Sequence, residues 1–496
     1  MGVRIDLVDI PATSSVSALE RVTPQNDTNN APVPENNSEN TSTVIATTPT
    51  RDQYPGVLAR LDGLNDLSLI KDYKPPKKTV LENGLTIIGE HTPGALSTYV
   101  SVWVNAGSMH EDPKNNGVAH FVEHMALKGT VSRSNIDIKK EMQRIGNNVN
   151  AFTSQQHTCY HARVLNKYVT DSLKLFFDML LNSVIDQKEF DNERKVVLEE
   201  LKMYKDSPED HIGDLIYEVA CKSHPMGRPV LGTTKIISGM QRETLLDFMS
   251  DFYTPDNITV SVAGDFDWDI VVELCRNLTS GVNRKKREVV IPELTVCPGV
   301  YIKNKQIEQT HLILSTKGLP VINNDRYALY IIDTALGGGF NSRLFNEIRE
   351  KRGLAYTVKS ETELTPLGGM FGIYTGIPGE DIECVLNVIL EELKNVRERG
   401  LTSEELDMAK VQLVDELIMD HEGAEETANG NASEYFHHQR FVPLSESISK
   451  ILVVTNEDII RVAKEIFDPK YFTLVVLGPK KELPKGFEQI IKDDDA

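Results

Sequence analysis

The sequence Gly117-Val118-Ala119-His120-Phe121-Val122-Glu123-His124-Met125 combines helical apolar spacing with two histidines and a glutamate, and predicts a helix from Val118 to Leu127. On a helix, positions i, i+3 and i+4 share one face, so His120, Glu123 and His124 point to the same side. Two imidazoles one turn apart suit zinc, and a neighbouring carboxylate can take a proton from metal-bound water. The H-x-x-E-H order reverses the common H-E-x-x-H zinc signature. Alone, the pattern leaves open a pair of ordinary surface or packed histidines.

A catalytic zinc site needs a third protein ligand and an open position, and a second helical segment supplies the candidate. Val197 and Tyr204 belong to its apolar stripe, and Glu193 and Glu200 fall on the same side of the helix. Glu199 is rotated by about 100° from Glu200 and is less suited. We therefore expect Glu200 to be the third ligand and Glu193 to orient a ligand or share a proton. The alternative is a charged helix face without a metal.

The segments around the motif alternate between strand and helix patterns. Thr79 to Ile88 forms two short apolar runs about an Asn-Gly turn, which is typical of a β-hairpin. Further strands are expected at Leu96 to Ala106 and Ile258 to Gly264, and helices at Ile136 to Ile145, Val169 to Ile185, Asp186 to Tyr204 and His211 to Cys221. This half therefore combines a sheet with several helices.

The same order of patterns returns in the second half of the chain. Strands are expected at Thr310 to Ser315, Phe371 to Thr375 and Tyr471 to Leu477, and helices at Arg326 to Leu336, from Leu344 to Arg349, Ile382 to Arg399 and Ser403 to Asp420. We therefore predict an α+β fold of two similar tandem domains, each a mixed or antiparallel sheet packed with helices, of which only the first carries a metal motif.

Changes in composition predict the domain boundaries. Residues 1–75 include an Asn-, Thr- and Pro-rich stretch and are expected to be disordered, and a basic run followed by prolines marks a linker. The predicted segments are a disordered leader (1–75), a catalytic zinc-binding domain (76–283), a linker (284–302), an inactive homologous domain (303–483) and an acidic tail (484–496).

The bulk composition excludes several classes of protein. The net charge of -20 argues against a nucleic-acid partner, and no apolar run is long enough to predict a membrane span. The acidic balance either serves solubility alone or lines a cavity that attracts basic substrates. Five widely spaced cysteines without a C-x-x-C pair indicate reduced thiols. With no signal peptide, we expect a soluble, non-secreted protein of a bacterial-type cytoplasm or a mitochondrial-type organelle matrix.

The sequence resembles the pitrilysin, insulysin and mitochondrial processing peptidase family over roughly Lys77 to Pro484. The closest resemblance is to its shorter members, the β subunit of mitochondrial processing peptidase and the bacterial processing-type zinc proteases. In that family the third zinc ligand follows the second histidine by some 76 positions, and Glu200 lies 76 positions after His124. Leu127-Lys128-Gly129-Thr130 also resembles the sequence that follows the family's metal helix. The resemblance implies one Zn²⁺ per chain.

Two further stretches resemble the family's substrate-binding elements in the first half. Asn150-Ala151-Phe152-Thr153 is similar to its N-A-x-T edge strand, which implies that Asn150 helps to hold the peptide. Asp210 and Asp214 match two acidic positions that hold a substrate arginine in processing peptidases. The resemblance thus implies extended, basic peptides or presequences as substrates, whereas acids at such positions are otherwise ordinary solvated residues.

Two elements of the second half resemble the family as well. Arg349 and Tyr356 match its R-x6-Y element, whose side chains reach the substrate carbonyl and the developing oxyanion, and are therefore candidate catalytic residues. Gly337, Gly338 and Gly339 lack the Gly-Lys-Ser/Thr ending of a phosphate loop. They resemble the glycine-rich substrate-binding loop that two-subunit members keep on the non-catalytic partner. Its presence beside H-x-x-E-H favours a homodimer, with a heterodimer of related chains as the alternative.

The sequence therefore predicts a zinc-dependent metalloendopeptidase in which Glu123 assists attack by zinc-bound water on an extended peptide. A non-catalytic core or assembly subunit of the same fold is the first alternative, because this fold also serves in respiratory complexes. A peptide-binding partner that needs another chain for activity is the second. Cobalt or manganese could replace zinc in a site of histidine and carboxylate ligands.

Overall fold

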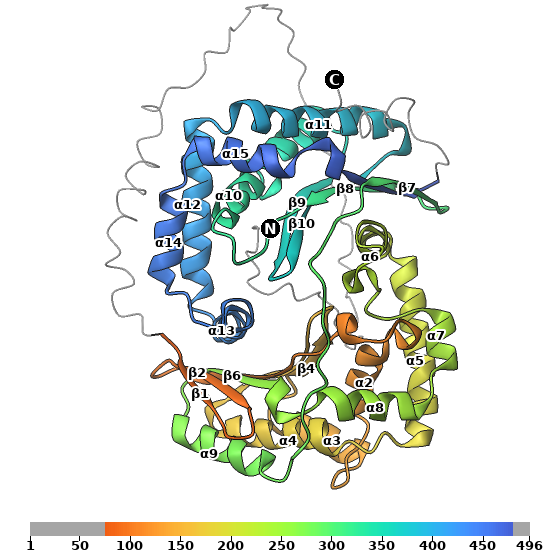
Figure 1. The fold of residues 1–496 in the computed structure, drawn as a ribbon, viewed down its shortest axis with the longest axis vertical. Helices are drawn as coiled ribbons and strands as arrows, with labels where there is room; N and C mark the ends of the chain where they lie inside the picture. The colour runs from red at the N-terminus through yellow and green to blue at the C-terminus, as the bar shows by residue number, and fades with distance from the viewer. Residues whose placement is uncertain (1–74, 480–496) are drawn as a thin grey trace, which may run out of the picture.

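The computed structural model describes residues 75–479, so the predicted disordered leader and acidic tail lie outside the described residues. Two β-sheets face the middle of the molecule, and most of the helices lie on their outer sides (Figure 1). The first sheet and its helices form one lobe, and the second sheet and its helices form the other. The predicted α+β fold is confirmed.

The first lobe contains a six-stranded sheet in the order β1-β2-β6-β3-β5-β4. Its strands are β1 (Lys77–Val80), β2 (Thr86–His91), β3 (Ser97–Val104), β4 (Val149–Thr153), β5 (Thr158–Leu165) and β6 (Ile258–Gly264). Its helices are α2 (Val118–Ala126), α3 (Asn135–Arg144), α4 (Val169–Asn182), α5 (Gln187–Asp206), α6 (Pro208–Ala220), α7 (Thr234–Gly239), α8 (Arg242–Phe252) and α9 (Trp268–Thr279). β1 and β2 pair antiparallel, which confirms the predicted hairpin.

The second lobe contains a five-stranded sheet in the order β7-β11-β8-β10-β9. Its strands are β7 (Gly299–Asn304), β8 (Thr310–Lys317), β9 (Thr357–Thr365), β10 (Gly368–Ile377) and β11 (Thr473–Gly478). Its longer helices are α10 (Arg326–Gly337), α11 (Ile382–Arg399), α12 (Ser403–Asp420), α13 (Ala424–His438), α14 (Leu444–Leu452) and α15 (Asn456–Ile466). The helix predicted from Leu344 is a π-helix, Phe345–Glu350. β7 begins inside the predicted linker, while residues 282–298 form no helix or strand.

The two sheets repeat one topology. Within the first sheet the order β2-β6-β3-β5-β4 corresponds to β7-β11-β8-β10-β9, and the chain passes through both sets in the same sequence. The pairing directions also agree, because only the first pair of each set is parallel. Along the chain, a helix follows the second strand of each set in both lobes: α2 follows β3, and α10 follows β8. The chain is therefore a tandem repeat, as predicted, and α2 and α10 hold equivalent places.

Each sheet is also covered by one helix from the other lobe. α6 of the first lobe packs against β8 and β11, where Ile212 and Leu215 share an apolar cluster with Val475 and Leu477. α13 of the second lobe packs against β2, β3 and β6 of the first (Figure 1). The approach is close, since Ser261 of β6 donates a hydrogen bond to the carbonyl of Ala428 of α13 at 2.7 Å, and both residues are small. The two lobes are thus interlocked by an exchange of helices.

Two predictions about the chain as a whole can be compared with the structure. Within residues 75–479, no helix is long and apolar enough to cross a membrane. The five cysteines form no disulfide with one another in the structure.

Candidate metal centre

The helix α2 that carries the H-x-x-E-H motif is buried along its whole length. Its apolar side chains, including Phe121, Val122 and Met125, belong to the core of the first lobe. His120, Glu123 and His124 are less than a tenth exposed as well, so a helix with three titratable side chains is held inside the protein. Burial of such groups is costly unless they are paired or bind a metal.

The helix α5 brings the distant glutamates to this motif. Asp186 caps its first turn by accepting hydrogen bonds from the amides of Lys188 and Glu189. Its buried side chains then recur at helical spacing, and these are Phe190, Glu193, Val197 and Leu201. This stripe packs toward α2 and places Glu200 beside the two histidines.

Ligand atoms of His120, His124 and Glu200 all lie within 4.8 Å of one another. Glu200 Oε2 is 3.7 Å from His120 Nε2 and 3.2 Å from His124 Nε2. Two donor atoms that share one tetrahedral zinc ion at 2.0–2.2 Å are separated by about 3.3 Å. The distances therefore fit a divalent ion held between the three side chains.

Unsatisfied nitrogen atoms support the same conclusion. His124 Nε2 is buried and makes no hydrogen bond to any described residue, although the Glu200 carboxylate is close by. Buried polar groups rarely stay without a partner, so an imidazole nitrogen in this state is a feature to be explained. A metal ion between His124, His120 and Glu200 would satisfy it. Among the residues that the structure describes, this is the single group of three potential ligands.

Glu193 lies behind His124 and fixes its orientation. Glu193 Oε1 is 2.9 Å from His124 Nδ1, and its Oε2 is 2.6 Å from the ammonium nitrogen of Lys128. A carboxylate that accepts from Nδ1–H leaves the Nε2 lone pair free for a metal. Burial would raise the pKa of Glu193, but its bonds to His124 and Lys128 lower it, so this carboxylate stays ionised.

The charges around the metal-free site differ between its members. Burial lowers the pKa of His120 to about 3, with a further contribution from His124. Burial acts the same way on His124, but its hydrogen bond with Glu193 and the charge of the nearby Glu200 carboxylate outweigh burial and raise the pKa to about 10. Glu123 has a raised pKa because its burial outweighs the effect of His124 and of the hydrogen bond from Thr153. A glutamate with a raised pKa is better suited to accept a proton at neutral pH.

Two contacts at this centre escape any analysis of spacing alone. Thr153, at the end of β4, donates a hydrogen bond to Glu123 Oε2 at 2.8 Å, and Lys128 pairs with Glu193. Both residues occur in stretches that resemble the family, yet only the fold shows which carboxylate each one contacts. Thr153 and Lys128 thus hold the two carboxylates that flank His124 in fixed orientations.

The predicted substrate residues of the first lobe lie on different elements. Asn150 is exposed on β4, which is the edge strand of its sheet. Asp210 is exposed and Asp214 half-buried on α6, and burial followed by repulsion from Asp210 and Glu218 raises the pKa of Asp214 to about 6. No hydrogen bond or ion pair within residues 75–479 joins these three side chains to the candidate metal ligands.

Arg349 and Tyr356 contact each other in the second lobe. The Arg349 guanidinium lies over the rings of Phe345 and Tyr356, at 4.7 and 4.6 Å from their centroids. Tyr356 is 75% exposed. Within the described part of the chain, neither side chain makes a hydrogen bond, ion pair or ring contact with His120, His124 or Glu200. The single chain therefore does not bring this pair into contact with the candidate metal centre.

The glycine-rich loop begins at Gly337, the last residue of α10, and this residue has a packing role. A side chain at Gly337 would place Cβ 2.2 Å from the amide of Ser360, so α10 approaches β9 closely only with glycine here. Gly338 accepts a hydrogen bond from the side chain of Gln412. Gly337, Gly338 and Gly339 also line a cavity, as do Arg349 and Tyr356.

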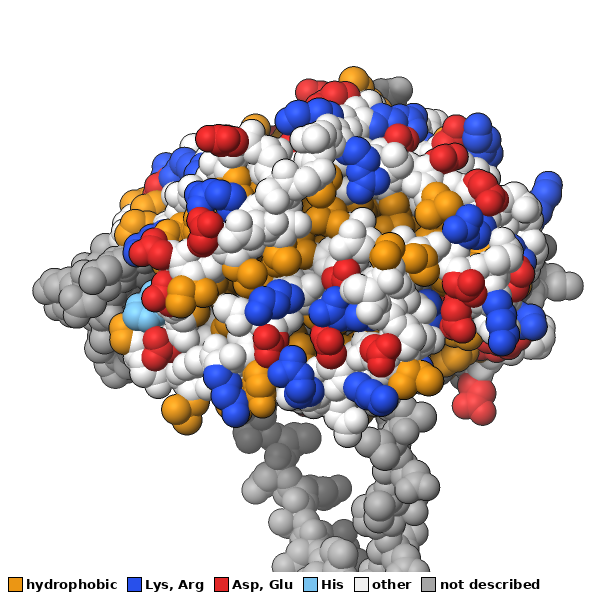
Figure 2. Space-filling view, turned by 90° about the horizontal axis from the view of Figure 1, so that it is seen from below, with side chains coloured by type: hydrophobic (Ala, Val, Ile, Leu, Met, Phe, Trp, Pro, Cys, Tyr) orange, Lys and Arg blue, Asp and Glu red, His pale blue; other side chains and the backbone are white. Residues whose placement is uncertain are grey.

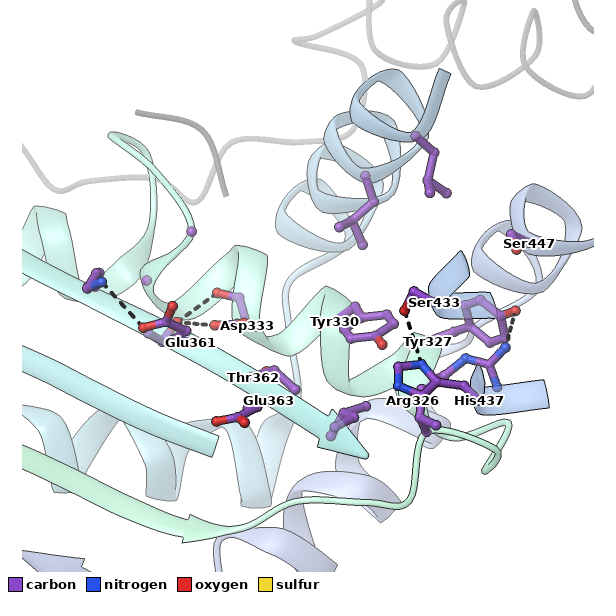
Figure 3. A pocket seen from close by; sticks show the side chains of 18 of the residues that line it. Arg326, Tyr327, Tyr330, Asp333, Glu361, Thr362, Glu363, Ser433, His437 and Ser447 are labelled. Atoms are coloured by element: carbon purple, nitrogen blue, oxygen red, sulfur yellow. Dashed lines mark hydrogen bonds and ion pairs between the residues drawn. The ribbon is translucent and has the colours of Figure 1, made fainter. Parts of the chain in front are cut away.

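This cavity of about 620 Å³ lies between the lobes. Figure 3 shows Arg326, Tyr330 and Asp333 on α10 and Glu361, Thr362 and Glu363 on β9. The first lobe contributes the turn between β4 and β5, residues 154–157, directly after Thr153. The cavity thus begins next to the residue that holds Glu123, but none of the three candidate ligands lines it.

The outer surface of the first lobe shows no concentration of acidic side chains (Figure 2). In the view from below, Lys and Arg side chains are interspersed with Asp and Glu (Figure 2). Carboxylates line the cavity, in contrast, at Asp333, Glu361, Glu363 and Glu434, together with the cations Arg326, Arg349 and Lys359. Some of the acidic side chains therefore face the cavity, although the cavity lining is of mixed charge.

Comparison with known proteins identifies the family. The model of the insulinase family, peptidase family M16, matches residues 86–234, and the model of the peptidase M16 inactive domain matches residues 239–413. A protein of Bacillus subtilis named as an uncharacterized zinc protease is 33% identical over 82% of this chain and 99% of its own length. A Mycobacterium leprae protein with the same description is 35% identical over 82% of this chain and 93% of its own length.

Solved structures share the fold. A protease from Helicobacter pylori has a TM-score of 0.76 at 25% identity and covers 82% of this chain and 100% of its own. A structure from Pseudomonas fluorescens, described as a peptidase M16 inactive domain, has a TM-score of 0.77 at 19% identity over 83% of this chain and 99% of its own, and shows the fold alone. The particular likeness to a processing peptidase β subunit stays a prediction. The metal-site geometry, the tandem fold and both family matches lead to one conclusion: the chain belongs to the insulinase family, peptidase family M16.

Proposed function

We propose that this protein is a zinc-dependent metalloendopeptidase with His120, His124 and Glu200 as its metal ligands and Glu123 as its general base. The observation that carries the proposal is that the two imidazoles of α2 and the Glu200 carboxylate of α5 converge, and that His124 Nε2 is buried there without a hydrogen bond. The family and the names of the bacterial relatives support peptidase chemistry. When bound, zinc supplies a Lewis acid for a peptide carbonyl and lowers the pKa of water.

Glu123 takes the proton from the attacking water and passes it to the leaving amine. Its neighbour Thr153 donates to Oε2, which leaves Oε1 free to face the water. Burial raises its pKa, so the carboxylate is a stronger base than an exposed glutamate. Glu193 keeps the His124 imidazole in place throughout the cycle, because its other oxygen is held by Lys128.

The substrate binds as an extended strand along β4. This strand is the edge of its sheet and leads, through Thr153, to Glu123. Edge strands bind peptides through backbone hydrogen bonds, and Asn150, which is exposed on this strand, helps to hold such a peptide. Basic peptides or presequences are the preferred class, with Asp210 and Asp214 as partners for an arginine. A peptide series with and without arginine near the cleaved bond tests this: equal cleavage of both contradicts the preference.

Arg349, Tyr356 and the loop of Gly337, Gly338 and Gly339 bind the substrate from the other side. They share one cavity, and the Arg349 side chain is supported on two aromatic rings. Because the single chain does not join this pair to the metal ligands, a homodimer that faces one metal centre with the loop of a second copy is the preferred assembly. A heterodimer with a related chain is the alternative, and measurement of mass and activity on the purified chain separates the two.

A non-catalytic assembly subunit of the same fold is the rival function. It is less well supported, since all three candidate ligands and Glu123 are present together, with His120, His124 and Glu123 buried and Glu200 half-buried. The purified chain is expected to contain zinc and to cleave unstructured peptides in a chelator-sensitive manner.

The Glu123→Gln variant tests the proposed mechanism. It removes the base but no metal ligand, so it is expected to bind zinc as tightly as wild type while kcat falls by about 10²–10⁴-fold, the usual contribution of a general base. Zinc content and peptide turnover are measured on the same preparation. Near-normal turnover by Glu123→Gln, or zinc-independent cleavage by wild type, contradicts the proposed function.

A further inference from the structure

The start of the metal-bearing helix α2 is capped by a side chain that lies outside the helix. The cap position is Gly117, which has a φ of +93° and no side chain to offer. A Cβ at this residue would lie 2.8 Å from the carbonyl oxygen of Leu231, so a capping serine or aspartate is excluded there. The first-turn amides of α2 therefore need another acceptor.

Glu111 supplies this acceptor. Its Oε2 accepts hydrogen bonds from the amide of Gly117 at 2.9 Å and from the side-chain amide of Asn116 at 2.8 Å, and its Oε1 accepts from the amide of Ala119 at 2.9 Å. The side chain is only 5% exposed. A buried carboxylate with three donors at a helix N-terminus also meets the positive end of the helix dipole.

The same residues tie α2 to a distant part of the first lobe. Asn116 donates a second hydrogen bond to the carbonyl of Pro229 at 2.9 Å, and the Arg228 guanidinium donates to the backbone carbonyl of Glu111. The loop before α2, the first turn of α2 and the segment around Pro229 thus meet at one carboxylate. Whatever moves this carboxylate also moves the first turn of the helix.

The first turn of α2 includes a candidate metal ligand. Ala119, whose amide binds Glu111, is the residue directly before His120. The helix runs only from Val118 to Ala126, and helices of this length are marginal without tertiary support. His124 is additionally held by Glu193, whereas His120 Nδ1 makes no hydrogen bond to a described residue. The position of His120 therefore depends mainly on the backbone of the first turn.

We infer that Glu111 is a positioning residue of the metal centre: it fixes the first turn of α2 and thereby sets the distance of His120 from His124 and Glu200. The inference rests on the proposed zinc-dependent function. Glu111 touches neither substrate nor metal, so its effect reaches the reaction only through the affinity of the site for its metal.

The Glu111→Gln variant tests this role with little change in volume. The amide has one acceptor oxygen in place of two, so in either orientation its NH₂ group faces a backbone or side-chain donor of Asn116, Gly117 or Ala119. Loss of a partner that orients a metal ligand weakens metal binding by about 10–100-fold. We expect a zinc dissociation constant raised by about 10-fold or more in a chelator competition, and a kcat that recovers when zinc is added in excess.

The matched control is Asp267→Ala, which removes the cap of α9. Asp267 accepts from the amide of Ile270 at 3.0 Å, and α9 carries none of the site residues. Loss of either cap is expected to lower the midpoint of thermal unfolding of the metal-free protein, but only Glu111→Gln is expected to change zinc affinity. The Asn116→Ala variant, which removes one of the three donors, is expected to weaken zinc binding to an intermediate degree and serves if Glu111→Gln does not fold.

Two different failures can be told apart. A zinc dissociation constant of Glu111→Gln within about twofold of wild type, with wild type still a zinc-dependent peptidase, overturns the role of Glu111 and leaves the proposed function standing. If the kcat of Glu111→Gln stays low at saturating zinc, Glu111 does not act through zinc binding alone, and the inference is overturned. A wild-type chain that binds no zinc overturns both the proposed function and this inference.

Discussion

At the scale of single residues, three carboxylates and one cation surround the two imidazoles of the site. The carboxylates are those of Glu123, Glu193 and Glu200, and the cation is Lys128. Glu193 and Glu200 contact opposite nitrogens of His124, and Lys128 neutralises Glu193 from its other side. In the metal-free state these carboxylates favour a proton on His124, which a bound metal ion would have to displace. We therefore expect metal affinity to depend on the neighbours of the candidate ligands as much as on those ligands.

Glu200 and its neighbour Glu199 provide a matched pair of variants. The Glu200 carboxylate is 16% exposed and faces both histidines, whereas that of Glu199 is 68% exposed and pairs with Lys202. Glu200→Gln is expected to weaken zinc binding by more than about 100-fold, beyond the loss typical of a residue that only orients a ligand. Glu199→Gln is expected to bind zinc as wild type does. Equal zinc affinities in a chelator competition would exclude Glu200 as the third ligand.

At the scale of helices and strands, the sequence predicts well what periodicity specifies. The expected ranges Val118 to Leu127 and Asp186 to Tyr204 differ by one or two residues from α2 and α5, because both helices carry a clear apolar stripe. Glu200 also lies where its place on that stripe predicted. The contacts of Thr153 and Lys128 could not be predicted, since they join elements that only the fold brings together.

Some elements were not predicted from the sequence. They include α8, α9, α14 and α15, which pack within their own lobes, and α13, which packs on the other lobe. α13 was not expected, because its inward residues include Ala428 and Ala432 in place of large apolar side chains. They suit close packing against another lobe's sheet and give little periodic signal. β5 and β9 were missed as well, since their inward positions include polar residues such as Thr158 and Ser360.

The exchanged helix α6 gives a prediction about stability. Ile212 of α6 is fully buried against the second lobe's sheet, whereas Ile270 of α9 is 54% exposed. Ile212→Ala is expected to cost about 2–5 kcal/mol in the free energy of unfolding, and Ile270→Ala less than about 0.5 kcal/mol. Both tryptophans, Trp103 and Trp268, lie in the first lobe, so their fluorescence reports on that lobe and circular dichroism on both. We expect the two signals to shift together, and a shift in only one would contradict the interlocking of the lobes.

At the scale of the whole molecule, two copies of one fold have diverged in chemistry. α2 carries the H-x-x-E-H motif, whereas the equivalent α10 contains no histidine and lines the cavity instead. The metal motif is thus found in one copy and the glycine-rich loop, Arg349 and Tyr356 in the other. The lobes are held together by α6 and α13, so the position of the candidate substrate residues of one copy depends on the packing of the other copy.

The contact between the lobes is also expected to respond to pH. His157 of the first lobe stacks on Phe436 of α13 at 4.4 Å, and burial, with smaller contributions from His437 and His110, lowers its pKa to about 3. An unfolded histidine titrates near 6.5, so below that pH the unfolded chain binds a proton that the folded chain refuses. Stability is therefore lost as the pH falls from about 6.5 toward 3, and His157 accounts for about 2 kcal/mol of this loss at pH 5.

The His157→Phe variant keeps a ring against Phe436 but cannot titrate. Its free energy of unfolding, from denaturant titrations at pH 7 and pH 5, is expected to fall by about 2 kcal/mol less than that of wild type over this interval. The comparison is between slopes, so a change in packing that affects both pH values equally does not disturb it. Identical losses in the two proteins would show that His157 does not contribute to the acid sensitivity of the interface.

The most direct test of the central claim is the zinc X-ray absorption spectrum of the purified wild-type protein. The account predicts one zinc per chain, with two imidazole nitrogens and a carboxylate oxygen at about 2.0–2.2 Å. A chain that contains no tightly bound zinc, or a spectrum with thiolate sulfur at about 2.3 Å from one of the five cysteines, would contradict it.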